Sequence, residues 1–232
     1  MKRVYLLVTV LVVAFLSPAI RATPIAHLEQ HLHLAVNAQS ASQRATALAT
    51  PDVYGTPLII QLARQGDVKA ILQAKAAASG KFLLVKDAYE NNVFHVAKNA
   101  DTVQALASLL RHFYAGQTSL QITDLVDARN AQGETPLLAQ INAGHADTFA
   151  PLYAYSTLKQ KNDKVKWQLA RLRGVNEEIA APNRAIYCAE IIKQASAGER
   201  TLLQAAQAQL PYHPEMAHVT RIISQEMPCL VN

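Results

Sequence analysis

The chain has 232 residues, of which 50% are hydrophobic, and a formal net charge of +5 at pH 7. This length suits one domain, or one repeat array with a terminal extension. The first 22 residues carry three basic side chains and no acidic one, so the rest of the chain has a net charge of only +2. So small a charge removes the main support for a protein that binds nucleic acid through its overall positive field.

Residues 1–22 have the three parts of a secretory signal peptide: a basic head, an apolar run and small residues at a cleavage site. These parts are Lys2 and Arg3, then Val4 to Leu16, then Ser17-Pro18-Ala19, with Ala22 as a second candidate for cleavage. An apolar run of this length reaches about 20 Å as a helix, whereas a bilayer core is about 30 Å thick. We therefore expect a cleaved signal rather than a membrane anchor, and a periplasmic or secreted protein.

Residues 23–50 are expected to form an N-terminal helix and a linker. Leu28 and Leu32 recur at helical spacing, and a polar, alanine-rich stretch follows as a loop or weak helix. The segment from His27 to His31 is similar to a zinc site, but the protease motif needs a glutamate directly after the first histidine, and Glu29 is one residue too late. A polar helix face is the favoured interpretation, and we assign no metal ligand.

A repeated pattern is clearest in residues 130–138, which read Asn-Ala-Gln-Gly-Glu-Thr-Pro-Leu-Leu. Gly133 can adopt the positive φ of a tight turn, Thr135 can cap a helix that Pro136 opens, and Gly144 can separate that helix from the next. This unit resembles the ankyrin repeat, which has a glycine nine residues after the Thr of its Thr-Pro-Leu-His segment. Two positions of the pattern differ, with Leu138 in place of the usual histidine and Gln140 in place of the usual alanine.

An earlier unit, residues 52–66, resembles the same pattern less closely. Gly55, Thr56 and Pro57 follow its leading aspartate, but the residue between the glycine and the threonine is missing. Here too we expect the threonine to cap a helix that the proline opens. Residues 51–156 would then hold about three stacked helix pairs, because no single pair can bury its own apolar face.

The middle unit, residues 87–97, is degenerate. Glu90 replaces the turn glycine, so we expect this position to tolerate substitution better than Gly133 does. Asn92 and Val93 replace Thr-Pro, whereas His95 is kept, and the resemblance implies that this histidine bonds the neighbouring turn rather than acting in catalysis. The leading residues of the units are 35 and 43 apart, so an insertion is expected around residues 114–123.

Residues 157–232 show no further repeat and are expected to form a helical cap on the array. One helical face carries Leu158, Val165, Leu169 and Leu172. A second helix is expected to open at Pro182-Asn183 and to close at Gly198, and two more to span residues 201–210 and 214–226.

Cys188 and Cys229 can pair in the oxidising compartment that the signal peptide implies. A bridge that closes a loop of about forty residues contributes about 4 kcal/mol in the chain-entropy model. Spacing alone leaves two separate thiols as the alternative. No histidine or aspartate motif stands beside Cys188, so a catalytic thiol is not expected.

A basic run extends from Lys159 to Arg173, offset only by Asp163, and contains Trp167. Such a run can contact an anionic surface weakly, or it can be a solvated helix face whose tryptophan is covered by later helices. The second interpretation is the favoured one.

Taken together, these patterns predict an all-α protein: an ankyrin-repeat solenoid flanked by an N-terminal helix and a C-terminal helical cap. The resemblance implies a non-catalytic module, without a cofactor, that binds a protein partner as a periplasmic accessory or secreted factor. The expected binding residues lie in the turn tips and are Tyr54, Tyr89, Gln132 and Glu134. The rival hypothesis is a secreted enzyme with an unrecognised active site in residues 157–232. The sequence assigns neither the partner nor an oligomeric state.

Overall fold

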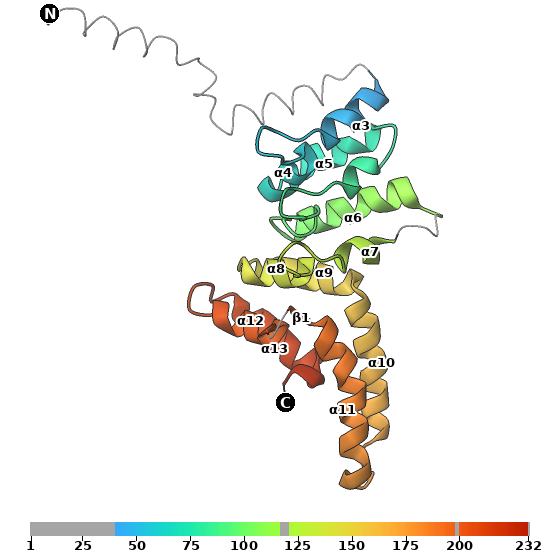
Figure 1. Ribbon diagram of the computed structural model, residues 1–232, viewed down its shortest axis with the longest axis vertical. Coiled ribbons are helices and arrows are strands. Elements are labelled where there is room, and N and C mark those ends of the chain that lie inside the picture. The colour runs from blue at the N-terminus through green and yellow to red at the C-terminus, as the bar shows by residue number, and fades with distance from the viewer. Residues whose placement is uncertain (1–39, 117–120, 198–199, 232) are drawn as a thin grey trace, which may run out of the picture.

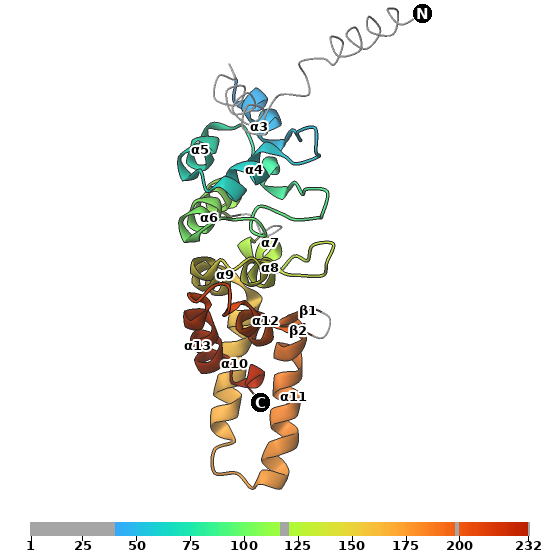
Figure 2. The same ribbon diagram turned by 90° about the vertical axis from the view of Figure 1, so that its left-hand side faces the viewer.

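The computed structural model describes residues 40–116, 121–197 and 200–231, and these residues are mostly helical. Layers of helices are stacked along the long axis of the molecule, from α3 at one end to α12 and α13 near the other, while α10 and α11 project from the stack as a hairpin (Figures 1 and 2). The prediction of an all-α fold is confirmed. The signal segment and the segment from His27 to His31 lie outside the described residues.

The described residues contain eleven α-helices, four 3-10 helices (η) and a two-stranded antiparallel ribbon, joined by turns and loops. The first part of the chain contains α3 Ala41–Ala49, α4 Leu58–Gln65, α5 Val68–Gln73, η2 Ala74–Ala76, η3 Lys81–Leu84, α6 Ala100–Tyr114, α7 Ile122–Val126, α8 Pro136–Asn142, η4 Ala146–Thr148 and α9 Phe149–Tyr155. The second part contains α10 Thr157–Arg171, α11 Glu177–Gln194, β1 Ser196–Ala197, β2 Arg200–Thr201, α12 Leu202–Gln209, α13 Met216–Glu226 and η5 Pro228–Leu230.

One apolar core runs through the whole stack, from Leu48 in α3 to Leu230 in η5. The layers meet through corresponding helices, because α5 packs on α6, α6 on α9, and α8 on α12. Large side chains with almost no exposed surface fill the interfaces between layers: Leu58, Ile59, Ile60, Ile71, Phe82, Phe94, Leu106, Leu109 and Phe149. In α6, Val103, Leu106, Leu109 and Leu110 are buried, whereas Leu72 of α5 is 38% exposed.

The middle unit has no first helix. Residues 93–96 form a single turn, after which Asn99 caps α6 through its side chain. The second helix of this unit has 15 residues, whereas α5 has six. Most of the residues that lengthen the interval to the next unit therefore lie in α6, because α7 occupies the same place before the next turn as η3 does in the first unit.

The start predicted for the second C-terminal helix is wrong. That helix, α11, begins at Glu177 and ends at Gln194, so Pro182 lies in its interior. Its start is fixed by Asn176, whose side chain accepts the N–H of Glu178, after a tight turn at Gly174 with φ of 82°. The capping residue therefore outweighs the proline as a start signal.

A further helix pair follows the hairpin in the stack. Thr201 caps α12 with its side chain, as Thr135 caps α8, and the two capped helices pack on each other. The next helix, α13, lies against α12 and contacts η4. The region read from sequence as a cap without further repeats thus contains a layer built like the earlier ones, and the α10–α11 hairpin is the segment that interrupts the stack.

Candidate partner-binding surface

Three turns of the stack share one hydrogen-bond pattern. In each turn, a side-chain oxygen of the leading Asp or Asn accepts the N–H groups of the residues two and four positions later. The leading residues and their donors are Asp52 with Tyr54 and Thr56, Asp87 with Tyr89 and Asn91, and Asn130 with Gln132 and Glu134, at 2.8–3.0 Å. The backbone N–H of each leading residue also donates to the carbonyl oxygen four positions later. The three turns are therefore equivalent, in the register that the sequence alignment of the units predicted.

The fourth residue of each turn has a left-handed backbone. Gly55 and Gly133 have φ of 77° and 75°, and Glu90 has φ of 61°. Glu90 is the one non-glycine residue with positive φ in the part of the chain that the structure describes. The backbone therefore needs the same conformation at Glu90 as at the two glycines, but a Cβ atom is already present there. The expectation that this position tolerates substitution better than Gly133 stays a prediction.

The turns stand in a row on one side of the stack (Figure 2). Asn130 donates from its side-chain amide to the side-chain oxygen of Asn91 at 3.0 Å, and the N–H of Ala131 donates to the carbonyl oxygen of Tyr89 at 3.0 Å. Arg129 extends the row to β1 by a 3.1 Å hydrogen bond to the carbonyl oxygen of Ser196. The middle and third turns are thus held edge to edge by hydrogen bonds, and the third is tied to β1.

His95 links the middle turn to the next one. Its Nε2–H donates to the carbonyl oxygen of Glu134 at 3.1 Å, and its Nδ1 accepts the backbone N–H of Asn92 at 3.2 Å. Burial lowers the pKa of His95 to about 4, so the ring is neutral at physiological pH, as this donor–acceptor pairing requires. The predicted structural contact of His95 with the neighbouring turn is confirmed.

Gln140 performs a role that the sequence did not reveal. Its buried side-chain amide donates to the carbonyl oxygens of Phe94 and His95 at 3.2 and 2.9 Å, and its Oε1 accepts from Nδ1 of His145 at 2.6 Å. The middle unit lacks a first helix, so its carbonyl groups have no helical N–H partners. Gln140 satisfies them from the next layer, which explains the departure from the alanine of the repeat pattern.

The two Thr-Pro pairs have different roles. Thr135 caps α8 by accepting the N–H of Leu138, and Pro136 is the first helical residue, as predicted. In the first unit, Pro57 itself occupies the cap position of α4 and Thr56 is not a capping residue. The missing residue of that unit moves Thr56 back into the turn, where its N–H binds the leading aspartate.

Gly144 is required for two reasons. It has φ of 77°, and a Cβ atom there would lie about 2.5 Å from the ring of His213. The loop before α13 therefore packs directly on the glycine that separates the two helices of the third unit.

The side chains at the turn tips differ in their exposure and in their hydrogen bonds. Tyr54 and Tyr89 are 73% and 63% exposed, and Gln132 is also exposed. Glu134 is half-buried, and its carboxylate accepts a 2.6 Å hydrogen bond from the side chain of Asn142. The two tyrosines and Gln132 can thus contact another molecule without rearrangement, whereas Glu134 is engaged in holding the end of α8.

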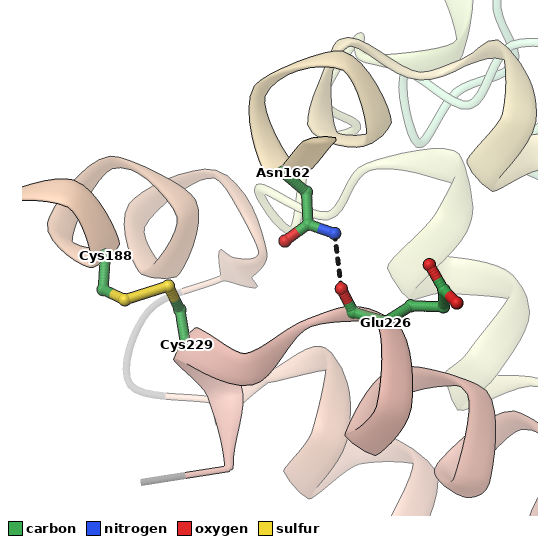
Figure 3. Close-up of a disulfide and its surroundings, with 4 residues drawn as sticks. All are labelled: Asn162, Cys188, Glu226 and Cys229. Atoms are coloured by element: carbon green, nitrogen blue, oxygen red, sulfur yellow. Dashed lines mark hydrogen bonds between the residues drawn. A yellow bond between two sulfur atoms is a disulfide. The ribbon is translucent and has the colours of Figure 1, made fainter. Parts of the chain in front are cut away.

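The C-terminal segment is fastened to the hairpin at three points. Cys188 of α11 and Cys229 of η5 form a disulfide, which confirms the predicted pairing. Figure 3 shows Asn162 of α10 beside it, where the side-chain amide donates to the carbonyl oxygen of Glu226 at 2.6 Å. The carboxylate of Glu226 pairs with Lys166 at 2.5 Å.

In residues 40–116, 121–197 and 200–231, no group of three His, Cys, Asp or Glu side chains is arranged to hold a metal ion. None of the helices in these ranges is long and apolar enough to cross a bilayer. No protein-family model matches the chain, and no curated protein is similar to it.

Proposed function

We propose that this chain is an exported, non-catalytic repeat protein of ankyrin type that binds a protein partner along the row of turns. The observation that carries the proposal is the pair of exposed tyrosines, Tyr54 and Tyr89, at equivalent positions of two turns with the same hydrogen bonds. Neither ring is needed for the turn, since the leading aspartate and the left-handed residue define it. Tyrosines held on a rigid backbone bury a large area at little entropic cost, which makes them favourable binding anchors.

Export is supported by the signal-like N-terminus and by the disulfide. Disulfides form and persist in oxidising compartments and are rare in the cytosol. Ankyrin-type repeats bind proteins through turn tips and first helices, and the row of turns is the corresponding surface of this stack. The partner is therefore a periplasmic protein or a protein of a host that the exported chain meets.

The rival role, an enzyme with its site in residues 157–232, needs several ionisable groups that converge in a cleft. Three of the four acidic residues of α10 and α11 instead form ion pairs with neighbouring cations at the surface: Lys159 with Asp163, Lys161 with Glu190, and Glu177 with Arg184. Their pairing favours the binding role over the catalytic one.

The test compares three forms of the mature protein, immobilised and exposed to periplasmic and host extracts: wild type, Tyr54→Ala with Tyr89→Ala, and Tyr212→Ala. Tyr212 is 79% exposed but lies outside the row of turns, so it is a matched control. We expect one or more proteins to be retained by wild type and by the control but lost with the double variant. Loss of two anchors should weaken the purified complex by about 2 kcal/mol, or about thirtyfold, with little change in melting temperature.

Two results would contradict the proposal. If all three forms retained the same proteins equally, the binding surface would lie outside the row of turns. A double variant that melts much lower would make the tyrosines part of the fold rather than of an interface.

A further inference from the structure

The far end of the α10–α11 hairpin exposes aromatic and aliphatic side chains. Trp167 is 62% exposed, Val175 38% and Ile179 58%, and the hairpin projects away from the stack (Figure 1). Trp167 stands four residues before the end of α10, and Ile179 is the third residue of α11. At about 1.5 Å per helical residue, both lie within about 6 Å of the hairpin end along the helix axes. The end of the hairpin, called the tip from here on, therefore exposes apolar side chains among charged ones.

Cations surround this tip. Lys164, Trp167 and Arg171 are spaced three and four residues apart, so they share the outer face of α10, opposite the buried Leu158 and Val165. The guanidinium of Arg171 lies 4.8 Å from the centre of the Trp167 ring.

The cations at the tip are available to an outside anion. Three other lysines of α10 are engaged in ion pairs, as are Glu177 and Arg184: Lys159, Lys161 and Lys166. Within the described ranges, by contrast, Lys164, Arg171 and Arg173 form no ion pair with a carboxylate.

We propose that this hairpin tip docks the protein on an anionic membrane surface. An interfacial element sinks apolar side chains about 5–10 Å into the boundary between headgroups and acyl chains, which matches the distance over which Trp167, Val175 and Ile179 are spread. Tryptophan is favoured at this depth, and free lysine and arginine side chains beside it meet lipid phosphates. The tip is a small surface at the end of a projecting hairpin, which fits a bilayer boundary. The hairpin tip is separate from the row of turns, so the protein can bind a membrane and a protein partner at the same time.

Binding to lipid vesicles tests the proposal directly. The oxidised mature protein should sediment with vesicles of phosphatidylglycerol and phosphatidylcholine but not with phosphatidylcholine alone, and salt should weaken the binding. Trp167 is the single tryptophan of the chain, so its fluorescence reports the tip without labelling. We expect a blue shift on binding and quenching by brominated acyl chains.

Charge variants give the matched comparison. Lys164→Glu with Arg171→Glu should lower the vesicle partition coefficient by about 25-fold or more, since each basic residue at an anionic surface contributes about fivefold. Lys69→Glu with Lys75→Glu makes the same change of net charge on exposed residues of α5 and η2, and should leave binding nearly unchanged. Glu178→Gln removes an exposed carboxylate beside Ile179 and should strengthen binding.

Three outcomes would overturn the proposal. The protein does not sediment with anionic vesicles, or both double variants lose the same amount of vesicle binding, or the emission of Trp167 does not shift when the protein is bound. Binding to polyglutamate without binding to vesicles would assign the tip to an acidic protein instead, and dimerisation that the tip variants abolish, without vesicle binding, would assign it to a second copy of the chain.

Discussion

Glu90 occupies the left-handed backbone region in a place where the two equivalent turns have glycine. A side chain with a Cβ atom is strained there by about 1 kcal/mol. We predict that Glu90→Gly raises the free energy of unfolding by about 0.5–1 kcal/mol, since the exposed pair with Lys86 that it removes contributes little. Gly133→Val should lower it by more than 1 kcal/mol, because a β-branched residue resists positive φ most strongly. Urea denaturation measures both, and Glu90→Gln, which keeps the strain and removes the charge, is the control. A stability loss in Glu90→Gly would contradict the role assigned to the turn.

His95 makes stability depend on pH. The folded chain keeps this ring neutral because burial lowers its pKa to about 4, whereas in the unfolded chain the pKa is about 6.5. Between these values the unfolded state binds more protons, so the free energy of unfolding falls as the pH falls from 6.5 to 4, by at most about 3 kcal/mol from this residue. Urea midpoints measured across this range should fall less steeply in His95→Gln than in wild type. Burial also lowers the pKa of His145, so His145→Gln separates its contribution. Parallel curves for wild type and His95→Gln would contradict the prediction.

The sequence predicts a residue's role well where the role depends on neighbours along the chain. Thr135 as a cap and Gly133 as a turn residue follow from local spacing, and the structure has both. Gln140 could not be predicted in the same way, because the carbonyl groups it satisfies become free only where the middle unit fails to form a helix. The positive φ of Glu90 was not apparent from the sequence either, because a residue other than glycine does not by itself indicate a left-handed backbone.

At the scale of elements, the sequence predicts the start of a helix correctly only where the capping residue can be recognised. Asn176 caps α11 six residues before Pro182, where the sequence predicts the start, and the threonine of the first unit lies one residue too early to cap α4. The α12–α13 pair was predicted as two helices but not as a layer of the stack. Its capping threonine is followed by leucine rather than proline, and 38 helical and turn residues of the hairpin separate it from the third unit. The packing of α12 on α8 shows that the α12–α13 pair is a further layer of the stack, which the sequence pattern does not indicate.

At the scale of the whole molecule, the continuous core couples every layer of the stack to the next. Each layer buries its apolar faces only against its neighbours, so stability depends on the contacts between layers as well as on each layer alone. The hairpin departs from this arrangement, since it projects from the stack (Figure 1) and is joined to the last layer by the contacts of Asn162 and Lys166 with Glu226 and by the disulfide. The covalent bond thus joins α11 of the hairpin to η5, which follows the last layer.

Removing the disulfide should therefore loosen the hairpin and the last layer together. Cys188→Ala with Cys229→Ala opens a loop of 41 residues, which the chain-entropy model values at about 4 kcal/mol of unfolding free energy. Alanine is the appropriate replacement because Cys229 is buried and a serine hydroxyl there would need a partner. Guanidinium denaturation of the oxidised protein, the reduced protein and the double variant should give one high midpoint and two similar low ones. Thiol labelling of protein isolated from its natural host should require reduction first, because the bond belongs to the exported form. An oxidised protein no more stable than the double variant would mean that the bond constrains a part of the chain already ordered when the rest is unfolded.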